Sequence, residues 1–231
     1  MEKVLPLLLI IGTLAVGILS IPLGSVPIPL EYIFNPEKAP EYIKIIIFNL
    51  RLPRIMMSIL VGMMLSSSGV VVQTVFQNPL ADPYIIGIAA SATFGAVIAF
   101  VFDMPDYMYG VIAFFTCLTS TLLIFKMAKK GNKVNVATLL IVGIAVSSFL
   151  GAFTSFAMYM IGEDSFKITM WMMGYLGNAT WSRVVFLAVP LVFSVSYFYS
   201  KRNQLDALLS GDEEAHSLGI DVNKLKLYYV A

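Results

Sequence analysis

Two arginines, Arg51 and Arg54, are the clearest candidates for a charged binding site in this sequence. They enclose the short run Arg-Leu-Pro-Arg. Residues three apart project from the same side of a helix start, and a guanidinium binds a carboxylate through paired hydrogen bonds. Arginines beside an apolar segment also serve as anchors at a membrane interface. The pair therefore predicts either a docking point for an acidic partner or an interfacial anchor.

Residue patterns of the common catalytic sites do not occur in the sequence. It contains no HExxH, no GxSxG, no Cys/His cluster and no GxxxxGK[ST]. Cys117 is the single cysteine, and the lone histidine, His216, is expected to be exposed to solvent. We therefore expect no enzymatic activity, no ATP hydrolysis by this chain, no bound metal and no cofactor.

Small and polar residues recur on one face of several apolar segments. Gly62, Ser66, Gly69 and Gln73 lie at helical spacing. Similar four-residue steps join Gly87, Ser91 and Gly95, and also Gly143, Ser147, Gly151 and Ser155. Such faces either pack closely on neighbouring helices or line a water-filled path. Ser66 and Gln73 are the path candidates, although Gln73 could instead form an interhelical hydrogen bond.

The elements that position these residues are predicted to be membrane-spanning helices. Hydrophobic residues make up 58% of the chain and charged residues 13%, and the mean hydropathy is +0.85. Soluble domains usually carry about 25% charged residues. Six segments are apolar and long enough to cross a bilayer: 4–23, 55–77, 84–102, 107–125, 138–161 and 183–200. A seventh begins at Leu225. The predicted fold is all-α, a polytopic membrane helix bundle in one domain, 1–231.

The distribution of lysine and arginine predicts the orientation of the bundle. With the N-terminus inside, the inside segments carry nine basic residues and the outside segments six. The cluster Lys126–Lys133 decides the assignment, because the facing loop 103–106 is acidic. Val4–Ile21 lacks the features of a cleaved signal peptide. Arg51 and Arg54 are then external, and the turn Asn78–Pro83 is cytoplasmic.

Two connections are long enough to hold helices of their own. Segment 24–50 is external and contains four prolines. Segment 201–224 is cytoplasmic and predicts two short helices, with Ser210 and Glu213 as a capping box for the second. Leu205, Leu208 and Leu209 give the first of these helices a small apolar face.

These motifs together resemble the FecCD-type permeases, which import ferric siderophores, haem and cobalamin. The resemblance rests on RLPR at 51–54, LVG at 60–62, SG at 68–69, Gln73, NPLADP at 78–83 and Gly87. It implies a multi-pass permease subunit of an ATP-binding-cassette importer in the cytoplasmic (inner) membrane, with its N-terminus in the cytoplasm. Family members have ten spans, so the resemblance also implies that this chain is shortened.

The resemblance assigns roles to particular residues. Arg51 and Arg54 would meet acidic residues on an external binding protein, and Asn78 and Leu80 would form part of a cytoplasmic gate. A second gate element of the family, a Thr-Ser pair, is replaced here by 136–137 and is not carried over. The coupling helices that fit a groove on the ATPase are matched by Leu205, Leu208, Gly211, Glu213, Ala215, Leu218 and Gly219.

The partners implied are two ATP-binding subunits, a second permease copy (an identical chain or a close paralogue), an external substrate-binding protein and the lipid bilayer. Nucleic acid is not among them, because no basic stripe with interleaved aromatic residues occurs. The sequence does not choose between a ferric siderophore, haem, cobalamin or another metal chelate. The alternatives are a secondary transporter or channel with an inverted repeat and an intramembrane enzyme, for which no nucleophile and base pair is present.

Overall fold

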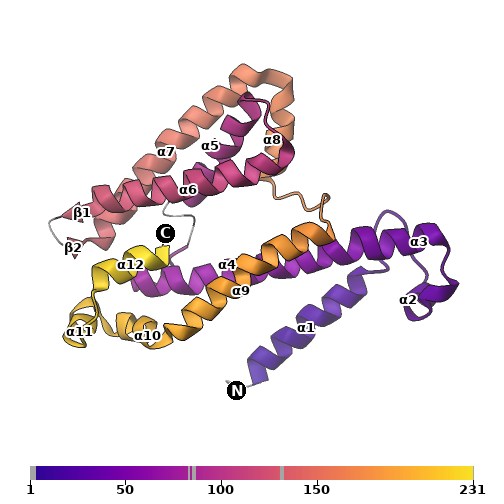
Figure 1. The fold of residues 1–231 in the computed structure, drawn as a ribbon, viewed down its shortest axis with the longest axis horizontal. Helices are drawn as coiled ribbons and strands as arrows, with labels where there is room; N and C mark the ends of the chain where they lie inside the picture. Colours follow the sequence, from indigo (N-terminus) through magenta and orange to yellow (C-terminus); the bar gives the residue numbers. More distant parts are fainter. Residues whose placement is uncertain (1–3, 83, 85–86, 131–132, 231) are drawn as a thin grey trace. The chain divides into compact units, whose positions relative to one another are not determined.

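The computed structural model describes residues 4–82, 84, 87–130 and 133–230, and it is almost entirely helical (Figure 1). The predicted all-α class is confirmed. Each of the six predicted apolar segments overlaps one of the longer helices. These are α1 (Val4–Ser20), α4 (Leu52–Phe76), α5 (Ile88–Val101), α6 (Asp106–Ala128), α7 (Val136–Ile161) and α9 (Trp181–Ser200).

Shorter elements connect these helices. They are α2 (Leu30–Phe34), η1 (Pro36–Lys38), α3 (Glu41–Ile45), η2 (Ile46–Arg51), η4 (Gly162–Asp164), α8 (Ser165–Met172), α10 (Arg202–Ser210), α11 (Asp212–Ser217) and α12 (Val222–Val230). Two-residue strands, β1 (Lys129–Lys130) and β2 (Lys133–Val134), pair antiparallel between α6 and α7.

Four continuous helical stretches are long and apolar enough to cross a bilayer: Glu41–Phe76, Asp106–Ala128, Val136–Met172 and Trp181–Ser200. The helices Val4–Ser20 and Ile88–Val101 are apolar but shorter. The predicted third span was placed at 84–102, but its helix begins only at Ile88, after Gly87 in a left-handed conformation. The count of six spans and a seventh stays a prediction.

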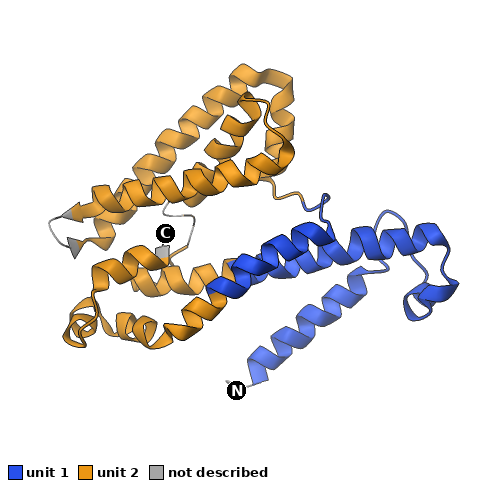
Figure 2. Ribbon diagram, in the orientation of Figure 1, with its two compact units in different colours: residues 1–64, 176–194 blue, residues 65–175, 195–231 orange. Residues whose placement is uncertain are grey.

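Contacts between Cα atoms divide the chain into two compact units (Figure 2). Unit 1 comprises 1–64 and 176–194, and unit 2 comprises 65–175 and 195–231. Helices α4 and α9 each contribute residues to both units. The assignment of a single permease domain stays a prediction.

Unit 1 has a small core built by the connection after α1. Four buried side chains form it: Ile28, Ala39, Ile43 and Ile47. Segment 24–50, whose length is typical of loops that carry function or short helices of their own, forms α2, η1, α3 and η2. The π-helical turn η2 ends two residues before Pro53, and the Leu52 N–H bonds the carbonyl of Ile47. A widened turn is one way for a helix to accommodate a proline, which has no N–H and crowds the preceding turn.

Small residues bring α5 close to its neighbours in unit 2. A Cβ on Gly95 would lie 2.9 Å from the Cα of Ala113 on α6, and one on Gly87 would lie 2.6 Å from the Ser147 hydroxyl on α7. Thr116 Oγ1 donates to the Ser91 carbonyl at 2.9 Å. Close packing therefore explains the small residues of this span.

The main core of unit 2 joins the end of α4 to α6, α7 and the C-terminal helices. Its most buried side chains come from five helices: Val71, Val75, Ile124, Ala128, Leu139, Leu208 and Ala215. α12 contributes Val222, Leu225 and Tyr229 to the same core. The C-terminal helices are thus held on the end of α4 by apolar packing.

Candidate functional site

Arg51, one of the two predicted docking residues, is held by the backbone of the loop that follows α1. Its guanidinium donates to the carbonyls of Ile21 and Val26. Gly24 lies within this loop at φ +146°, and a Cβ there would come within 2.9 Å of Arg51 Nη2. The Arg51 side chain is half-buried. Two of its N–H donors bond neutral carbonyl groups of this chain.

Arg54 and Arg183 bond the same short loop in unit 1. Arg54 Nη2 donates to the Gly177 carbonyl at 3.3 Å, and Arg183 Nη1 donates to the Asn178 carbonyl at 2.9 Å. Both side chains are exposed. Within the part of the chain that the structure describes, no carboxylate pairs with Arg51, Arg54 or Arg183. The three guanidinium groups donate instead to backbone carbonyls.

The sequence analysis did not single out Arg183 as a docking candidate. It lies two residues after Trp181, whose Nε1 donates to the Phe48 carbonyl at 2.8 Å. An arginine beside a tryptophan at the start of an apolar segment was the signal that could have identified it.

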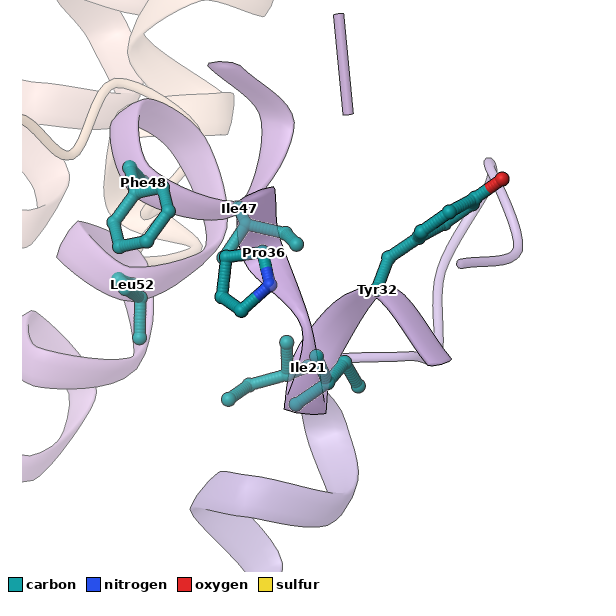
Figure 3. A pocket seen from close by; sticks show the side chains of 7 residues that line it. Ile21, Tyr32, Pro36, Ile47, Phe48 and Leu52 are labelled. Atoms are coloured by element: carbon teal, nitrogen blue, oxygen red, sulfur yellow. The ribbon is translucent and has the colours of Figure 1, made fainter. Parts of the chain in front are cut away.

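A small apolar cavity of about 190 Å³ lies in unit 1 (Figure 3). Its walls are almost wholly hydrocarbon, and the Tyr32 hydroxyl points away from the other labelled side chains. The lining residues are Ile21, Tyr32, Ile33, Pro36, Ile47, Phe48 and Leu52. It has no charged group with which to recognise an ionic ligand.

The predicted gate turn is held by backbone and side-chain hydrogen bonds, and its Leu80 side chain is exposed. Helix α4 ends at Phe76, and the next residue, Gln77, lies in the left-handed region at φ 51°. The N–H groups of Gln77 and Asn78 bond the carbonyls of Thr74 and Gln73, which is the Schellman pattern. Asn78 Oδ1 then accepts from the Leu80 N–H at 2.9 Å. Leu80 is 84% exposed, and Pro83 lies outside the described residues.

The two path candidates on α4, Ser66 and Gln73, both have exposed side chains. Gln73 makes no side-chain hydrogen bond to the residues that the structure describes, so the interhelical bond considered above is not formed there. A Cβ on either Gly62 or Gly69 would meet no atom within 4 Å. Among the residues that the structure describes, this face of α4 is thus uncovered, in contrast to the packed glycines of α5.

Segment 201–224 forms the two predicted short helices, but the predicted capping box is wrong. Ser210 is the last residue of α10, and Gly211 separates the helices at φ +127°. Gly211 is the N-cap of α11 and has no side chain with which to cap it. The local Ser-x-x-Glu pattern was overridden because the chain turns sharply here, in a conformation that favours glycine.

The seven predicted coupling residues differ in exposure. Leu208 and Ala215 are fully buried in the core of unit 2, whereas Leu218 is 71% exposed. Leu205 and Gly211 are half-buried, and Glu213 and Gly219 are exposed. The apolar surface of Leu208 is already covered by this chain, and its role in coupling to an ATPase stays a prediction. The neighbouring His216 is exposed, as predicted.

A polar network that the sequence analysis missed joins the end of α4 to α11 and α12. Gln77 Nε2 donates to the Leu208 carbonyl at 2.9 Å and to Asp212 Oδ1 at 3.0 Å. Lys226 Nζ lies 2.6 Å from Asp212 Oδ2, and the lysine is only 2% exposed. Lysine is almost never buried without a partner. The sequence analysis counted Lys226 only among the nine basic residues of the inside segments.

The comparisons with known proteins agree with the resemblance found in the sequence. A profile of the FecCD transport family matches residues 9–231. The chain is 35% identical over 195 residues to the cobalamin import system permease protein BtuC of Halobacterium salinarum, covering 83% of this chain and 52% of the relative. It is 32% identical to the hemin transport system permease protein HmuU of Yersinia pestis, covering 96% and 67%.

A solved structure described as an inward-facing conformation of a putative metal-chelate type ABC transporter has the same fold. Its TM-score is 0.85 at 26% identity, over 100% of this chain and 72% of that one. The chain spans about half to two thirds of the length of the two curated relatives. The family profile, the curated relatives and the fold agree: the chain belongs to the FecCD transport family.

Proposed function

We propose that this chain is a membrane-spanning permease subunit of an ATP-driven importer for a metal chelate. The observation that carries the proposal is the pair of short helices α10 and α11. They pack on the same core as the end of α4, which bears the gate turn. Work done by a partner on these helices would reach the gate through a continuous packed element.

The proposed cargo class follows the relatives, whose names specify cobalamin and hemin import. The cargo would be a cobalamin, haem or ferric-siderophore type of molecule, delivered by an external binding protein. The cargo would pass between two permease copies, along the uncovered face of α4 that carries Ser66 and Gln73. ATP would be hydrolysed by two partner subunits.

The proposed topology places the N-terminus and the loop between α6 and α7 in the cytoplasm of the cell, with six spans and a seventh beginning in α12. Labelling tests it directly. Cys117 is replaced by serine, and a single cysteine is introduced by Lys129→Cys or, as the matched control, Asp103→Cys. A membrane-impermeant thiol reagent in intact cells should label position 103 only. External labelling at 129 would contradict the orientation.

The proposed contact with the ATPase centres on Leu218, which is exposed, rather than Leu208, which is not. Leu218→Asp should leave membrane insertion unchanged and reduce co-purification of the ATPase, because a charged side chain would be buried at the contact. Leu218→Met, which keeps an apolar side chain of similar volume, is the control. Equal recovery of the ATPase with wild type and Leu218→Asp would remove this contact from the proposal.

A further inference from the structure

We infer that Gln77, Asp212 and Lys226 form a polar link that fixes the coupling helix α11 to the gate turn. The inference rests on the proposed importer function and names residues that position the moving parts. The link would pass a displacement of α11 to Leu80. Three segments meet at Asp212: the turn directly after α4 through Gln77, α11 through Asp212 itself, and α12 through Lys226.

The carboxylate of Asp212 lies at the centre of the link. One oxygen is 2.6 Å from Lys226 Nζ and the other accepts from Gln77 Nε2 at 3.0 Å. Both carboxylate oxygens therefore have partners outside α11. Asp212 is the first residue of α11, so holding its carboxylate fixes where this helix begins. A carboxylate is also favoured at a helix N-terminus, where the backbone dipole is positive.

Burial makes the Lys226 contact specific. Lys226 is 2% exposed, while the Asp212 side chain keeps 47% of its surface accessible. A buried ammonium group is costly unless a carboxylate balances it. Apolar groups of the same volume often give equal or better stability at such positions. The contact of this buried ammonium group with the half-exposed Asp212 is therefore better explained by the arrangement of helices that it specifies than by the stability that it adds.

Gln77 connects this pair to the gate. Its backbone has φ 51°, a conformation usually taken by glycine or asparagine. Its amide bonds the Leu208 carbonyl, in the last turn of α10, and also Asp212 Oδ1, at the start of α11. Gln77 thus bonds both proposed coupling helices at the point where α10 ends and α11 begins. Strained backbone of this kind persists only where surrounding contacts hold it in place.

Only a short, constrained stretch separates Gln77 from Leu80. Asn78 Oδ1 accepts from the Leu80 N–H at 2.9 Å, and the Ala81 N–H bonds the Asn78 carbonyl at 3.0 Å. Two hydrogen bonds across four residues leave this turn little freedom. A displacement of the turn at Gly211, which connects α10 to α11, would therefore be passed through Gln77 to Leu80. The short stretch between Gln77 and Leu80 would not absorb it.

The test compares transport with ATP hydrolysis in the assembled transporter. Asp212→Asn keeps the size of the side chain but removes its charge, and Asp212→Asn with Lys226→Met removes both charges without leaving a buried ammonium group. The matched control is Glu214→Gln, which removes one charge from the same helical turn. The link predicts that uptake per ATP hydrolysed falls by about tenfold in both Asp212 variants, within the range of roughly 5–150-fold typical of coupling between sites. Glu214→Gln should behave as wild type.

The charge-reversed pair, Asp212→Lys with Lys226→Asp, restores a contact of opposite charges but leaves Gln77 Nε2 without an acceptor at position 212, so it should recover only part of the coupling. Wild-type uptake per ATP in the double neutral variant would overturn the link. So would a loss of uptake that follows only the amount of complex recovered. An absence of ATP-dependent uptake in the wild-type transporter would instead refute the proposed function on which the link rests.

Discussion

Positive side chains are used in opposite ways in the two units of this protein. In unit 1, Arg51, Arg54 and Arg183 donate to backbone carbonyls, which are neutral, so each arginine keeps its charge. In unit 2, the buried Lys226 is balanced by Asp212. The first arrangement orients cations while leaving them able to attract an acidic partner, and the second uses a cation to hold helices together. The positive charge of these side chains does not distinguish the two roles. The partner does, since the arginines bond neutral carbonyls and the lysine bonds a carboxylate.

The largest expected effect comes from placing an unpaired charge in the core of unit 2. Leu208→Asp would bury a carboxylate at a position that is fully buried, at a cost of several kcal/mol. The chain should fail to accumulate, measured as folded protein after detergent extraction. Leu209→Asp, at a neighbour that is 60% exposed, is the control and should fold. Normal folding of Leu208→Asp would show that this core is not closed within the chain.

A moderate effect is expected where the backbone of unit 1 holds Arg51. Gly24→Ala would place a Cβ against the guanidinium at φ +146°, a conformation that costs about 1–3 kcal/mol for other residues. The melting temperature should fall, and binding-protein docking should weaken because Arg51 is displaced. Gly12→Ala is the control, since a Cβ there would meet nothing within 4 Å. Equal effects of the two changes would argue against a specific hold on Arg51.

The role of the unneutralised arginines is tested by reversing their charge. Arg54→Glu with Arg183→Glu should weaken docking of an acidic binding protein by about tenfold, and should remove its dependence on salt. A single exposed pair is worth about 0–1 kcal/mol, so each single change should have a small effect. Binding is measured in detergent at low and high salt. Reversal of Lys44, which pairs with Glu41 at 3.8 Å, is the control. If the double variant binds the acidic protein with unchanged affinity and salt dependence, both arginines serve only as anchors at the membrane interface.

The smallest expected effect concerns Asp221 at the start of α12. Its carboxylate accepts from the Lys224 N–H at 3.2 Å and pairs with Lys224 Nζ at 3.1 Å. The hydrogen bond from the Lys224 backbone is the main reason that the pKa of Asp221 is lowered. A lowered pKa means that Asp221 stabilises the fold above its ordinary pKa, and that this contribution is lost as the pH falls through the lowered value. Asp221→Ala should therefore slightly reduce the fall of the melting temperature at acid pH. If the melting temperature of this variant falls with pH as it does in wild type, the contribution assigned to the Asp221 carboxylate is refuted.

Local patterns predicted the helices of this protein well but predicted their contacts poorly. Segment 201–224 was correctly expected to form two short helices, because apolar spacing and Gly219 are local signals. The boundary between them was missed because the conformation of Gly211 depends on how the two helices pack. The bond from Gln77 to Asp212 spans 135 residues and that from Arg54 to Gly177 spans 123. No periodicity in a sequence encodes such pairs, so the polar link and Arg183 were found only in the structure.

Reconstituted uptake tests the central claim most directly. The transporter is placed in vesicles with its ATPase subunits, and uptake of cyanocobalamin, haemin or a ferric siderophore is measured with the binding protein on the opposite side. The account predicts that uptake of at least one of them requires ATP on the side of the 126–133 loop and stops when the binding protein is omitted. Uptake driven by an ion gradient without ATP would contradict it and favour a secondary transporter.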